Sequence, residues 1–183
     1  MKIFQTSLDG VFVIEPTIYG DERGYFFESF NAEQFARETG LEAHFVQDNE
    51  AKSRRGVVRG LHYQLPPYAQ AKLVRVVSGV VWDVAVDIRR NSPTFGQYTA
   101  IELSGENKRQ LYIPEGFAHG YAVLSDEAVF QYKCTEYYHP ESEGGIMWND
   151  PQLAIPWPLS IEEMILSEKD RRHPAFADAQ LFE

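Results

Sequence analysis

The sequence predicts a mainly β protein, a jelly-roll barrel with a few short peripheral helices. Three observations support this prediction. Segments in which apolar and polar residues alternate recur along the chain, as strands require. The 13 glycines and 10 prolines lie at short intervals between these segments, where turns are expected. Only two segments look helical, and no repeat, linker or low-complexity stretch divides the 183 residues, so we expect a single domain over 1–183.

Eight segments are expected to form strands because they alternate in polarity and are rich in β-branched and aromatic residues. They are 11–19, 25–30, 57–64, 72–77, 80–88, 98–103, 109–113 and 128–138. In the clearest of them, Val80, Trp82, Val84, Val86 and Ile88 alternate with Val81, Asp83, Ala85 and Asp87. One face of this strand is apolar and the other presents carboxylates. So many short strands indicate a sandwich or a closed barrel with room for one small ligand, and the pattern alone does not separate the possible β-barrels.

Two helices are expected beside the strands. The first spans 32–39, with Asn31 as its N-cap, Gln34 at the capping-box position and Gly40 just beyond its end. The second lies near 161–169. Both flank the strand-rich region, so we place them at the edge of the barrel.

The charge balance argues against a nucleic-acid partner. Lysine and arginine number 17 against 27 aspartates and glutamates, a net charge of −10, which repels a phosphate backbone. A small anionic ligand remains compatible, because it senses only local charge. The lone cysteine, Cys134, forms no internal disulfide and is interpreted as a small core residue. With no signal-like or membrane-length apolar run, we expect a cytoplasmic protein without membrane attachment.

The segment RGLHYQ at 59–64 places His62 and Gln64 on one face of a strand. Arg59 then points to the other face, unless Gly60 marks a bulge that redirects it or Arg59 reaches the site from the rim. Taken alone, His62 is equally consistent with a histidine that is hydrogen-bonded within the core.

Two further strands present unusual side chains on their expected inner faces. Lys72 shares a face with Val74 and Val76, and a buried lysine needs a partner; the alternative is a lysine whose amine extends from the strand end to solvent. Tyr132 shares a face with the apolar residues two positions before and after it. Taken alone, Tyr132 is consistent with an aromatic side chain packed in the core.

His119 follows the Pro-Glu-Gly turn at 114–116, a spacing that is seen in metal-binding cupin barrels. Such a site usually has two ligand histidines one residue apart on an earlier strand, but here His62 is followed by Gln64 at the second position. Three good metal ligands are therefore hard to assemble. We expect no metal, and interpret His119 as a substrate contact or a structural histidine.

Longer motifs resemble one family closely. The segments that match are GDERG at 20–24, FES at 27–29, FVQDN at 45–49, RGLHYQ at 59–64, QAKLVR at 70–75, SPTFGQ at 92–97, NKRQLYIPEGFAHG at 107–120, YY at 137–138, SEG at 142–144 and WND at 148–150. Together they resemble the dTDP-4-dehydrorhamnose 3,5-epimerases. The resemblance is dense from about residue 20 to 150, and so long an ordered match is more specific than any single motif.

The resemblance implies a cupin-like jelly roll that acts on a dTDP-4-keto-6-deoxyhexose without a cofactor. The ketone acidifies the hydrogens on C3 and C5, because each carbanion delocalises into an enolate. By similarity, His62 is the base, Asp170 orients its ring, Lys72 stabilises the enolate oxygen and Tyr132 is the acid on the opposite face. The position of Asp170 depends on a short match, LSEKD at 166–170, and His173 matches no family role.

The resemblance also implies contacts to the substrate and a homodimer in which the N-terminal strands are exchanged between subunits. Arg23 and Arg59 match diphosphate ligands, since a guanidinium donates paired hydrogen bonds to phosphate. Tyr138 matches a residue that stacks on thymine. The other matching contact positions are Glu28, Gln47, Asn49, His119, Glu143 and Lys169.

Three other functions remain open at this stage. An epimerase that acts on only one of the two carbons has the same motifs, although Tyr132 favours double epimerisation. A nucleotide-sugar-binding barrel without turnover needs no acid and base together, so the combination of His62, Lys72, Tyr132 and Asp170 argues against it. A metal-dependent cupin isomerase or oxygenase is disfavoured by Gln64.

Overall fold

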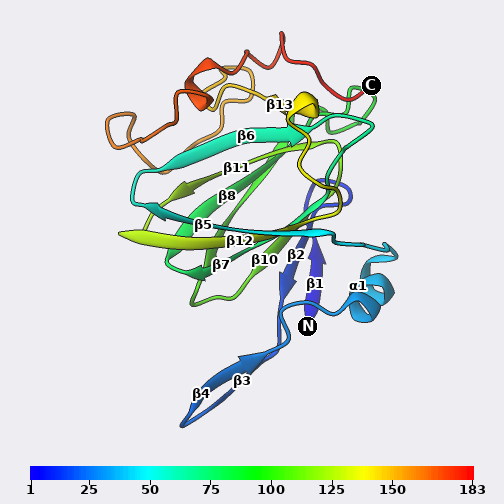
Figure 1. Cartoon of the computed structure of the whole chain (residues 1–183), viewed down its shortest axis with the longest axis vertical. Coiled ribbons are helices and arrows are strands. Elements are labelled where there is room, and N and C mark those ends of the chain that lie inside the picture. The colour runs from blue at the N-terminus through cyan, green and yellow to red at the C-terminus, as the bar shows by residue number, and fades with distance from the viewer.

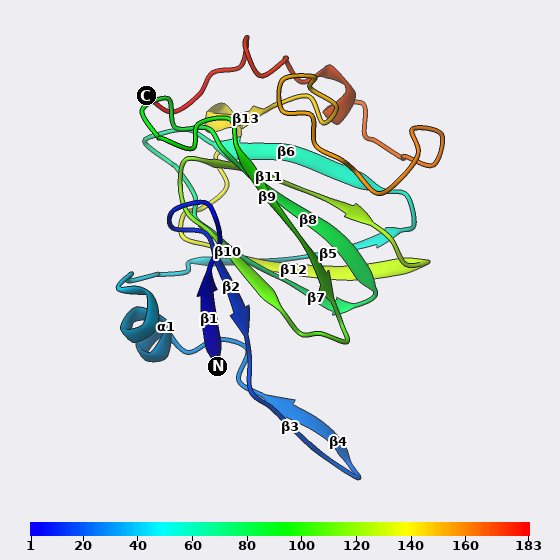
Figure 2. The ribbon, with the colours of Figure 1, turned by 180° about the vertical axis from the view of Figure 1, so that it is seen from behind.

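A computed structural model describes residues 1–183 and consists mainly of two antiparallel sheets that face each other (Figure 1). The six-stranded sheet has the order β1 (Lys2–Gln5), β2 (Phe12–Glu15), β10 (Gln110–Ile113), β7 (Lys72–Ser78), β12 (Glu127–Cys134) and β5 (Gln47–Arg54). The five-stranded sheet has the order β13 (Glu143–Gly145), β6 (Val58–Gln64), β11 (Phe117–Val123), β8 (Val80–Asp87) and β9 (Tyr98–Ser104). The view from behind shows the strands of both sheets running across one body (Figure 2). The predicted mainly β architecture is confirmed.

The main core fills the space between the two sheets. Val74 and Phe130 of the six-stranded sheet pack in one cluster with Val81, Ala85 and Tyr121 of the five-stranded sheet. All five side chains are at most 5% exposed. The inward faces of β7 and β12 are therefore the ones that alternation predicts.

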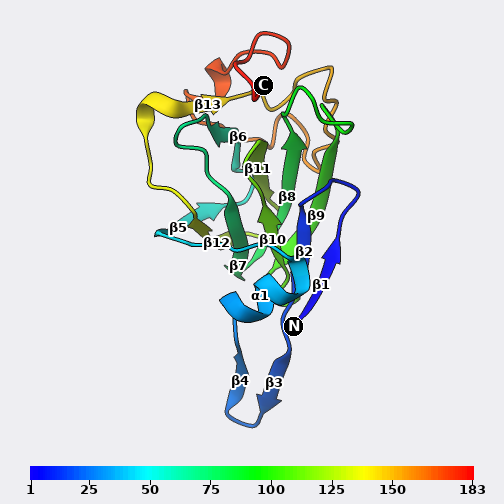
Figure 3. The same ribbon diagram turned by 90° about the vertical axis from the view of Figure 1, so that its right-hand side faces the viewer.

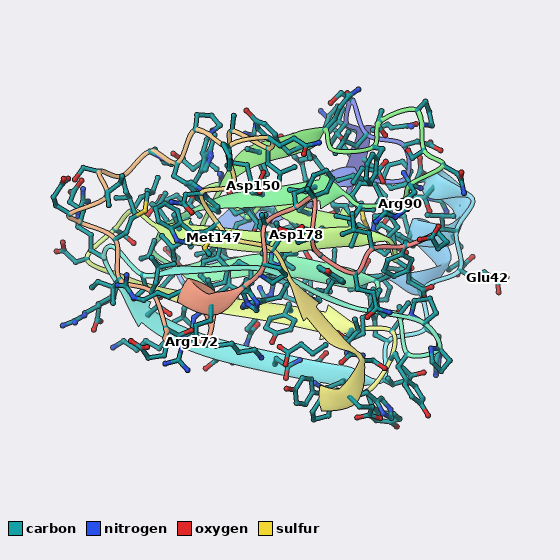
Figure 4. All side chains as sticks on the ribbon, turned by 90° about the horizontal axis from the view of Figure 1, so that it is seen from above. Glu42, Arg90, Met147, Asp150, Arg172 and Asp178 are labelled. Atoms are coloured by element: carbon teal, nitrogen blue, oxygen red, sulfur yellow. The ribbon has the colours of Figure 1, made fainter.

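A second core lies on the outer face of the five-stranded sheet. Val84 and Val86 of β8 pack there against Phe176 and Leu181 of the C-terminal segment. Figure 4 shows this segment crossing above the strands near the labelled Met147, Asp150 and Asp178. Asp150 anchors this segment by accepting a hydrogen bond from the backbone N–H of Phe176 at 2.8 Å. Both faces of β8 are consequently buried, although the sequence distinguishes them as apolar and acidic.

The predicted helix at 32–39 is confirmed. In α1 (Ala32–Thr39), the side chain of Asn31 accepts a hydrogen bond from the backbone N–H of Gln34 at 2.9 Å, and Gly40 ends the helix in the left-handed conformation. Phe35 is fully buried against Leu73 on the outward side of the six-stranded sheet. Burial of such a side chain contributes about 1.5–3 kcal/mol.

The predicted helix at 161–169 is wrong. Ile165 instead forms a parallel bridge to Val57 beside β6, and its N–H and C=O bond to Gly56 and Val58. These backbone groups are therefore engaged with the barrel and unavailable to a helix. The only helical turn nearby is the 3₁₀ helix η2 (Asp170–Arg172); a second, η1 (Pro140–Ser142), precedes β13. No helix of the structure is long and apolar enough to cross a membrane.

The strand boundaries differ from the predicted ones where burial or proline changes the pattern. The predicted strand 11–19 is divided around Pro16 into β2 and β3 (Ile18–Asp21), 25–30 shortens to β4 (Gly24–Phe27), and 128–138 ends at Cys134. Strands β1, β5, β11 and β13 were not predicted. β11 shows no alternation because all seven of its residues are buried, and β5 is polar on both faces.

The β3–β4 hairpin projects away from the body of the protein. Figure 3 shows it extending beyond α1 and the N-terminus at one end of the molecule. It carries large hydrophobic side chains that are strongly exposed, with Tyr19 at 66%, Tyr25 at 60% and Phe26 at 70%. Such a concentration of exposed aromatic surface on one arm is typical of an interaction surface.

Candidate active site

Two adjoining cavities lie between the sheets and share three lining side chains, His62, Lys72 and Tyr132. The outer cavity has a volume of about 330 Å³ and the inner one about 140 Å³. Strand β6 supplies His62 from one sheet, while β7 and β12 supply Lys72 and Tyr132 from the other. Three side chains that the sequence singles out thus meet at one place.

His62 is paired with Asp170. The Nε2 atom of His62 lies 2.5 Å from Oδ1 of Asp170, whose side chain is 5% exposed. Ser167 holds the other carboxylate oxygen by donating its hydroxyl to Oδ2 at 2.7 Å. Burial alone would raise the pKa of Asp170, but its neighbours His173, His62 and Ser167 lower it on balance. A carboxylate in this position keeps the proton of neutral His62 on Nε2 and leaves Nδ1 as the free basic nitrogen.

The direction of Arg59 is decided by a β-bulge. His62 pairs with His119 and Arg59 pairs with Tyr121, so β6 uses three residue steps where β11 uses two. Arg59 consequently lines the inner cavity together with His62. Gly60 permits the close approach of the strands, since a Cβ atom there would lie 2.5 Å from Cα of Gly120.

Lys72 and Tyr132 have pKa values shifted by burial. Burial lowers the pKa of Lys72 by disfavouring its ammonium form. Burial likewise raises the pKa of Tyr132 to about 12, so that its phenol is protonated at neutral pH. An oriented imidazole and a neutral phenol on facing walls can remove a proton from a molecule between them and return one from the other side.

A second histidine–carboxylate pair lies at the inner cavity. The Nε2 atom of His119 lies 3.0 Å from both oxygens of Asp83, which is fully buried, and burial raises the pKa of that carboxyl. Sequence reasoning assigned no role to Asp83, although the acidic face of 80–88 was visible. What it could not show is that this acidic face points between the sheets.

The predicted contacts of the nucleotide lie mainly at the outer cavity. Tyr138 donates its hydroxyl to Glu143 at 2.8 Å, and Lys169 pairs with the same carboxylate. Gln47 donates to Oδ1 of Asn49 at 3.0 Å at the edge of this cavity. All of these polar groups come from β5 or from the segments around β13 and η2.

Arg23 and Glu28 are not brought to the cavities of their own chain. Arg23 lies at the tip of the β3–β4 hairpin, where it pairs with Asp21 and its side chain is 85% exposed. Glu28 follows β4 and is also exposed. Within one chain, the predicted site therefore lacks these two residues.

Comparison with known proteins agrees with this geometry. The family described as dTDP-4-dehydrorhamnose 3,5-epimerase matches residues 5–178. The dTDP-4-dehydrorhamnose 3,5-epimerase of Shigella flexneri is 54% identical over 100% of this chain and 99% of its own. The chain belongs to the dTDP-4-dehydrorhamnose 3,5-epimerase family. It is an isomerase, and the predicted family is confirmed.

Solved structures show how closely the fold of this epimerase follows its relatives. The dTDP-6-deoxy-D-glucose-3,5-epimerase of Legionella pneumophila, in complex with dTDP-4-keto-L-rhamnose, is 56% identical with a TM-score of 0.93 and covers 97% of this chain and 93% of its own. ChmJ, a 3'-monoepimerase from Streptomyces bikiniensis in complex with dTDP-quinovose, is 37% identical with a TM-score of 0.88 and covers 94% and 86%. The cupin-like jelly roll is thus confirmed, and it is shared by enzymes of both specificities.

His173, to which no role was assigned, also lies at the site of this epimerase. Its ring centroid lies 5.4 Å from that of His62, and its Nε2 lies 3.6 Å from Oδ1 of Asp170. The Asp-Arg-Arg-His order in a helical turn places residues 170 and 173 on one side, which is the only signal that the sequence offers.

Proposed function

We propose that this epimerase inverts C3 and C5 of dTDP-4-dehydro-6-deoxy-D-glucose to form dTDP-4-dehydro-L-rhamnose, as one domain over 1–183. The observation that carries the proposal is the placement of His62, held by Asp170, and Tyr132 on opposite walls of one cavity. Inversion requires that a proton leave one face of a carbon and return to the other. A single group on one face would restore the starting configuration.

His62 acts as the base through Nδ1, because its Nε2 is bonded to Asp170. When the ring takes up the proton from C3 or C5, the anionic carboxylate stabilises the imidazolium that forms. The electrons of the broken C–H bond delocalise onto the C4 oxygen as an enolate. No redox or metal cofactor is needed for this step, since the ketone itself accepts the charge.

Lys72 stabilises the enolate oxygen and Tyr132 protonates the opposite face. A positive charge within the barrel interacts strongly with a developing oxyanion, because little water screens it. The Tyr132 phenol carries a proton at neutral pH, since its pKa is raised to about 12. It donates that proton to carbon as the enolate returns to the ketone.

The outer cavity binds the nucleotide part of the substrate. Tyr138, 52% exposed at the mouth, stacks on thymine. Arg59 binds the diphosphate from the adjoining inner cavity, which it lines. The remaining polar contacts are assigned to Gln47, Asn49, His119, Glu143 and Lys169. The net charge of −10 does not oppose this, because the ligand meets local cations.

The active form is a homodimer in which each β3–β4 hairpin completes the site of the partner subunit. The exposed Tyr19, Tyr25 and Phe26 support this arrangement, because water-exposed aromatic surface of this kind is stabilised by burial against a second copy. Arg23 and Glu28 would then contribute their charges to a neighbouring cavity. The enzyme acts in the cytoplasm, where the free thiol of Cys134 stays reduced.

A second candidate, epimerisation of one carbon only, is favoured by the similarity to the monoepimerase ChmJ. Incubation of the enzyme with dTDP-4-dehydro-6-deoxy-D-glucose in deuterated water, followed by NMR, decides between them. We expect deuterium at both C3 and C5 with inversion at each. Inversion at a single carbon would support the second candidate, and binding without exchange would contradict both.

A further inference from the structure

His173 has an unusual environment for a buried histidine. Its side chain is only 10% exposed, yet Nε2 has no hydrogen-bond partner. An unpartnered polar atom in such a place costs free energy unless something binds to it. This atom points toward Asp170 and His62 rather than into an apolar part of the core.

The ring of His173 is held in place by the backbone around it. Gly145 pairs with His62 across β13 and β6, and a Cβ atom at Gly145 would lie 2.3 Å from Cε1 of His173. The missing side chain therefore creates the space in which the two imidazoles lie together. Pro174 fixes the chain beyond the ring, since its carbonyl accepts the N–H of Met147 at 2.8 Å.

We propose that His62, Asp170 and His173 form a binding site for a divalent transition-metal ion such as Zn²⁺, which inhibits the enzyme. One ring nitrogen of each histidine and a carboxylate oxygen of Asp170 all lie within 4.8 Å of one another. Zinc–ligand bonds of 2.0–2.2 Å place neighbouring ligand atoms about 3.3 Å apart. Oδ1 of Asp170 lies 2.5 Å from Nε2 of His62 and 3.6 Å from Nε2 of His173, so one distance is shorter and the other longer than that value.

The surroundings favour binding of a cation. Asp170 is held in its anionic form, and Ser167 orients it through the oxygen that the metal does not need. Two imidazoles and one carboxylate are a ligand set that suits zinc.

Metal binding would remove the base. Neutral His62 carries its proton on Nε2, which is the atom that would bind the metal. On metal binding this proton is released from Nε2, and another proton is taken up on Nδ1. The nitrogen that faces the substrate then has no lone pair with which to accept a proton from carbon. This inhibition rests on the proposed role of His62, whereas binding of the metal does not.

Binding and inhibition are measured separately. The absorption spectrum of bound Co²⁺, a spectroscopic substitute for Zn²⁺, reports binding alone, and the initial rate in chelator-buffered free Zn²⁺ reports inhibition. The variant His173→Phe keeps a flat ring against Gly145 but removes the metal ligand. If His173→Phe does not fold, His173→Gln is used in its place. His139→Gln is the matched control, since His139 is also paired with a carboxylate, Glu141, at 3.0 Å.

We expect one Co²⁺ per chain in the wild type and in His139→Gln, and none in the His173 variant. The free Zn²⁺ concentration that gives half inhibition should rise in the His173 variant by at least about 10- to 100-fold. Loss of a residue that only orients a metal ligand already weakens binding by about this factor. Equal Zn²⁺ sensitivity in all proteins, or no Co²⁺ spectrum in the wild type, would overturn the proposal. Binding without inhibition would support the metal site and contradict His62 as the base.

Discussion

His62 and Tyr132 owe their different chemistry to what surrounds each ring. His62 meets a carboxylate through one nitrogen and keeps the other free, whereas Tyr132 meets mainly apolar neighbours, which hold its proton on the phenol. Neither environment can be assigned from the residue type alone. The proposed division between base and acid therefore rests on these contacts, and it can be tested by removing each group in turn.

His62→Ala should lose deuterium exchange at both C3 and C5, because no enolate forms without proton abstraction. The rate should fall by about 10²–10⁴-fold. Tyr132→Phe keeps the packing but lacks the acid, so some exchange should remain while inversion falls sharply. NMR in deuterated water measures both. Wild-type exchange in a folded, substrate-binding His62→Ala protein would exclude His62 as the base.

At the scale of elements, the bulge in β6 determines which side chains meet. A regular strand would direct Arg59 and His62 to opposite faces, but the extra residue at 60–61 brings both to the inner cavity. Gly60 has φ of 126° and lies against the backbone of β11. The close approach and the backbone conformation both require glycine.

Gly60→Ala should therefore destabilise the protein more than backbone strain alone does. Gly24 is the matched control, because its φ of 127° is nearly the same but a Cβ atom there meets nothing within 4 Å. Strain should cost about 1–3 kcal/mol in Gly24→Ala, and Gly60→Ala should cost more. Urea unfolding at one protein concentration measures this, and equal losses would show that the strand contact is unimportant.

The turn after β8 is held by a buried carboxylate. Asp87 accepts hydrogen bonds from Arg89 at 2.8 Å and from Ser92 and Thr94 at 2.5 and 2.6 Å. Burial alone would raise the pKa of Asp87, but these hydrogen bonds lower it on balance. The lowered pKa means that Asp87 stabilises the fold above the ordinary aspartate pKa, about 3.9, and that this contribution is lost as the pH falls through the folded-state value.

Asp87→Asn should lower the free energy of unfolding at pH 7 by about 1.5–3 kcal/mol, the typical contribution of a hydrogen bond to a charged group. The difference from wild type should shrink below about pH 4, because the unfolded wild-type chain then takes up a proton on this carboxyl, which the folded protein accepts only at its lower pKa. Urea unfolding across this pH range tests the sign. Asp178→Asn, at an exposed position, serves as the control. A difference that does not change with pH would contradict the assignment.

At the scale of the whole molecule, the β3–β4 hairpin projects away from the body of its own chain. Its contacts to the rest of the chain include Lys108, whose amine lies 2.9 Å from the hydroxyl of Tyr25. Its tip carries Arg23, one of the predicted diphosphate ligands, away from the cavities (Figure 3). The proposed dimer would bury the exposed aromatic side chains and bring this arginine to a cavity of the partner subunit.

Mixed dimers of Arg23→Ala and His62→Ala subunits should recover activity that neither variant has alone. In a mixed dimer, the intact His62 of one subunit meets the intact Arg23 of the other. Random mixing gives one repaired site in half of the dimers, or about a quarter of wild-type activity. Light scattering gives the oligomeric state of each preparation. No recovery on mixing, or a fully active monomer at low concentration, would exclude shared sites.

Much of the architecture follows from local pattern. Alternation identified eight strand-forming segments and the inward faces of β7 and β12, because period-two burial is visible in the order of residues. The cap of α1 was equally readable, since Asn31, Gln34 and Gly40 act within one turn. Strand β11 and the segment 161–169 were not predictable, because burial on both faces removes alternation and a bridge to Val57 replaces the helix.

The sequence by itself determined the family and the mainly β class, and it singled out His62, Lys72 and Tyr132 as candidate catalytic residues, because motifs and residue order carry this information. Only the tertiary structure decided the direction of Arg59, the pairing of His119 with Asp83, and the position of His173 beside Asp170. Each of these depends on a bulge, a strand register or a chain crossing that joins segments far apart in sequence. Such contacts are set by the packing of the whole barrel, and no local pattern specifies them.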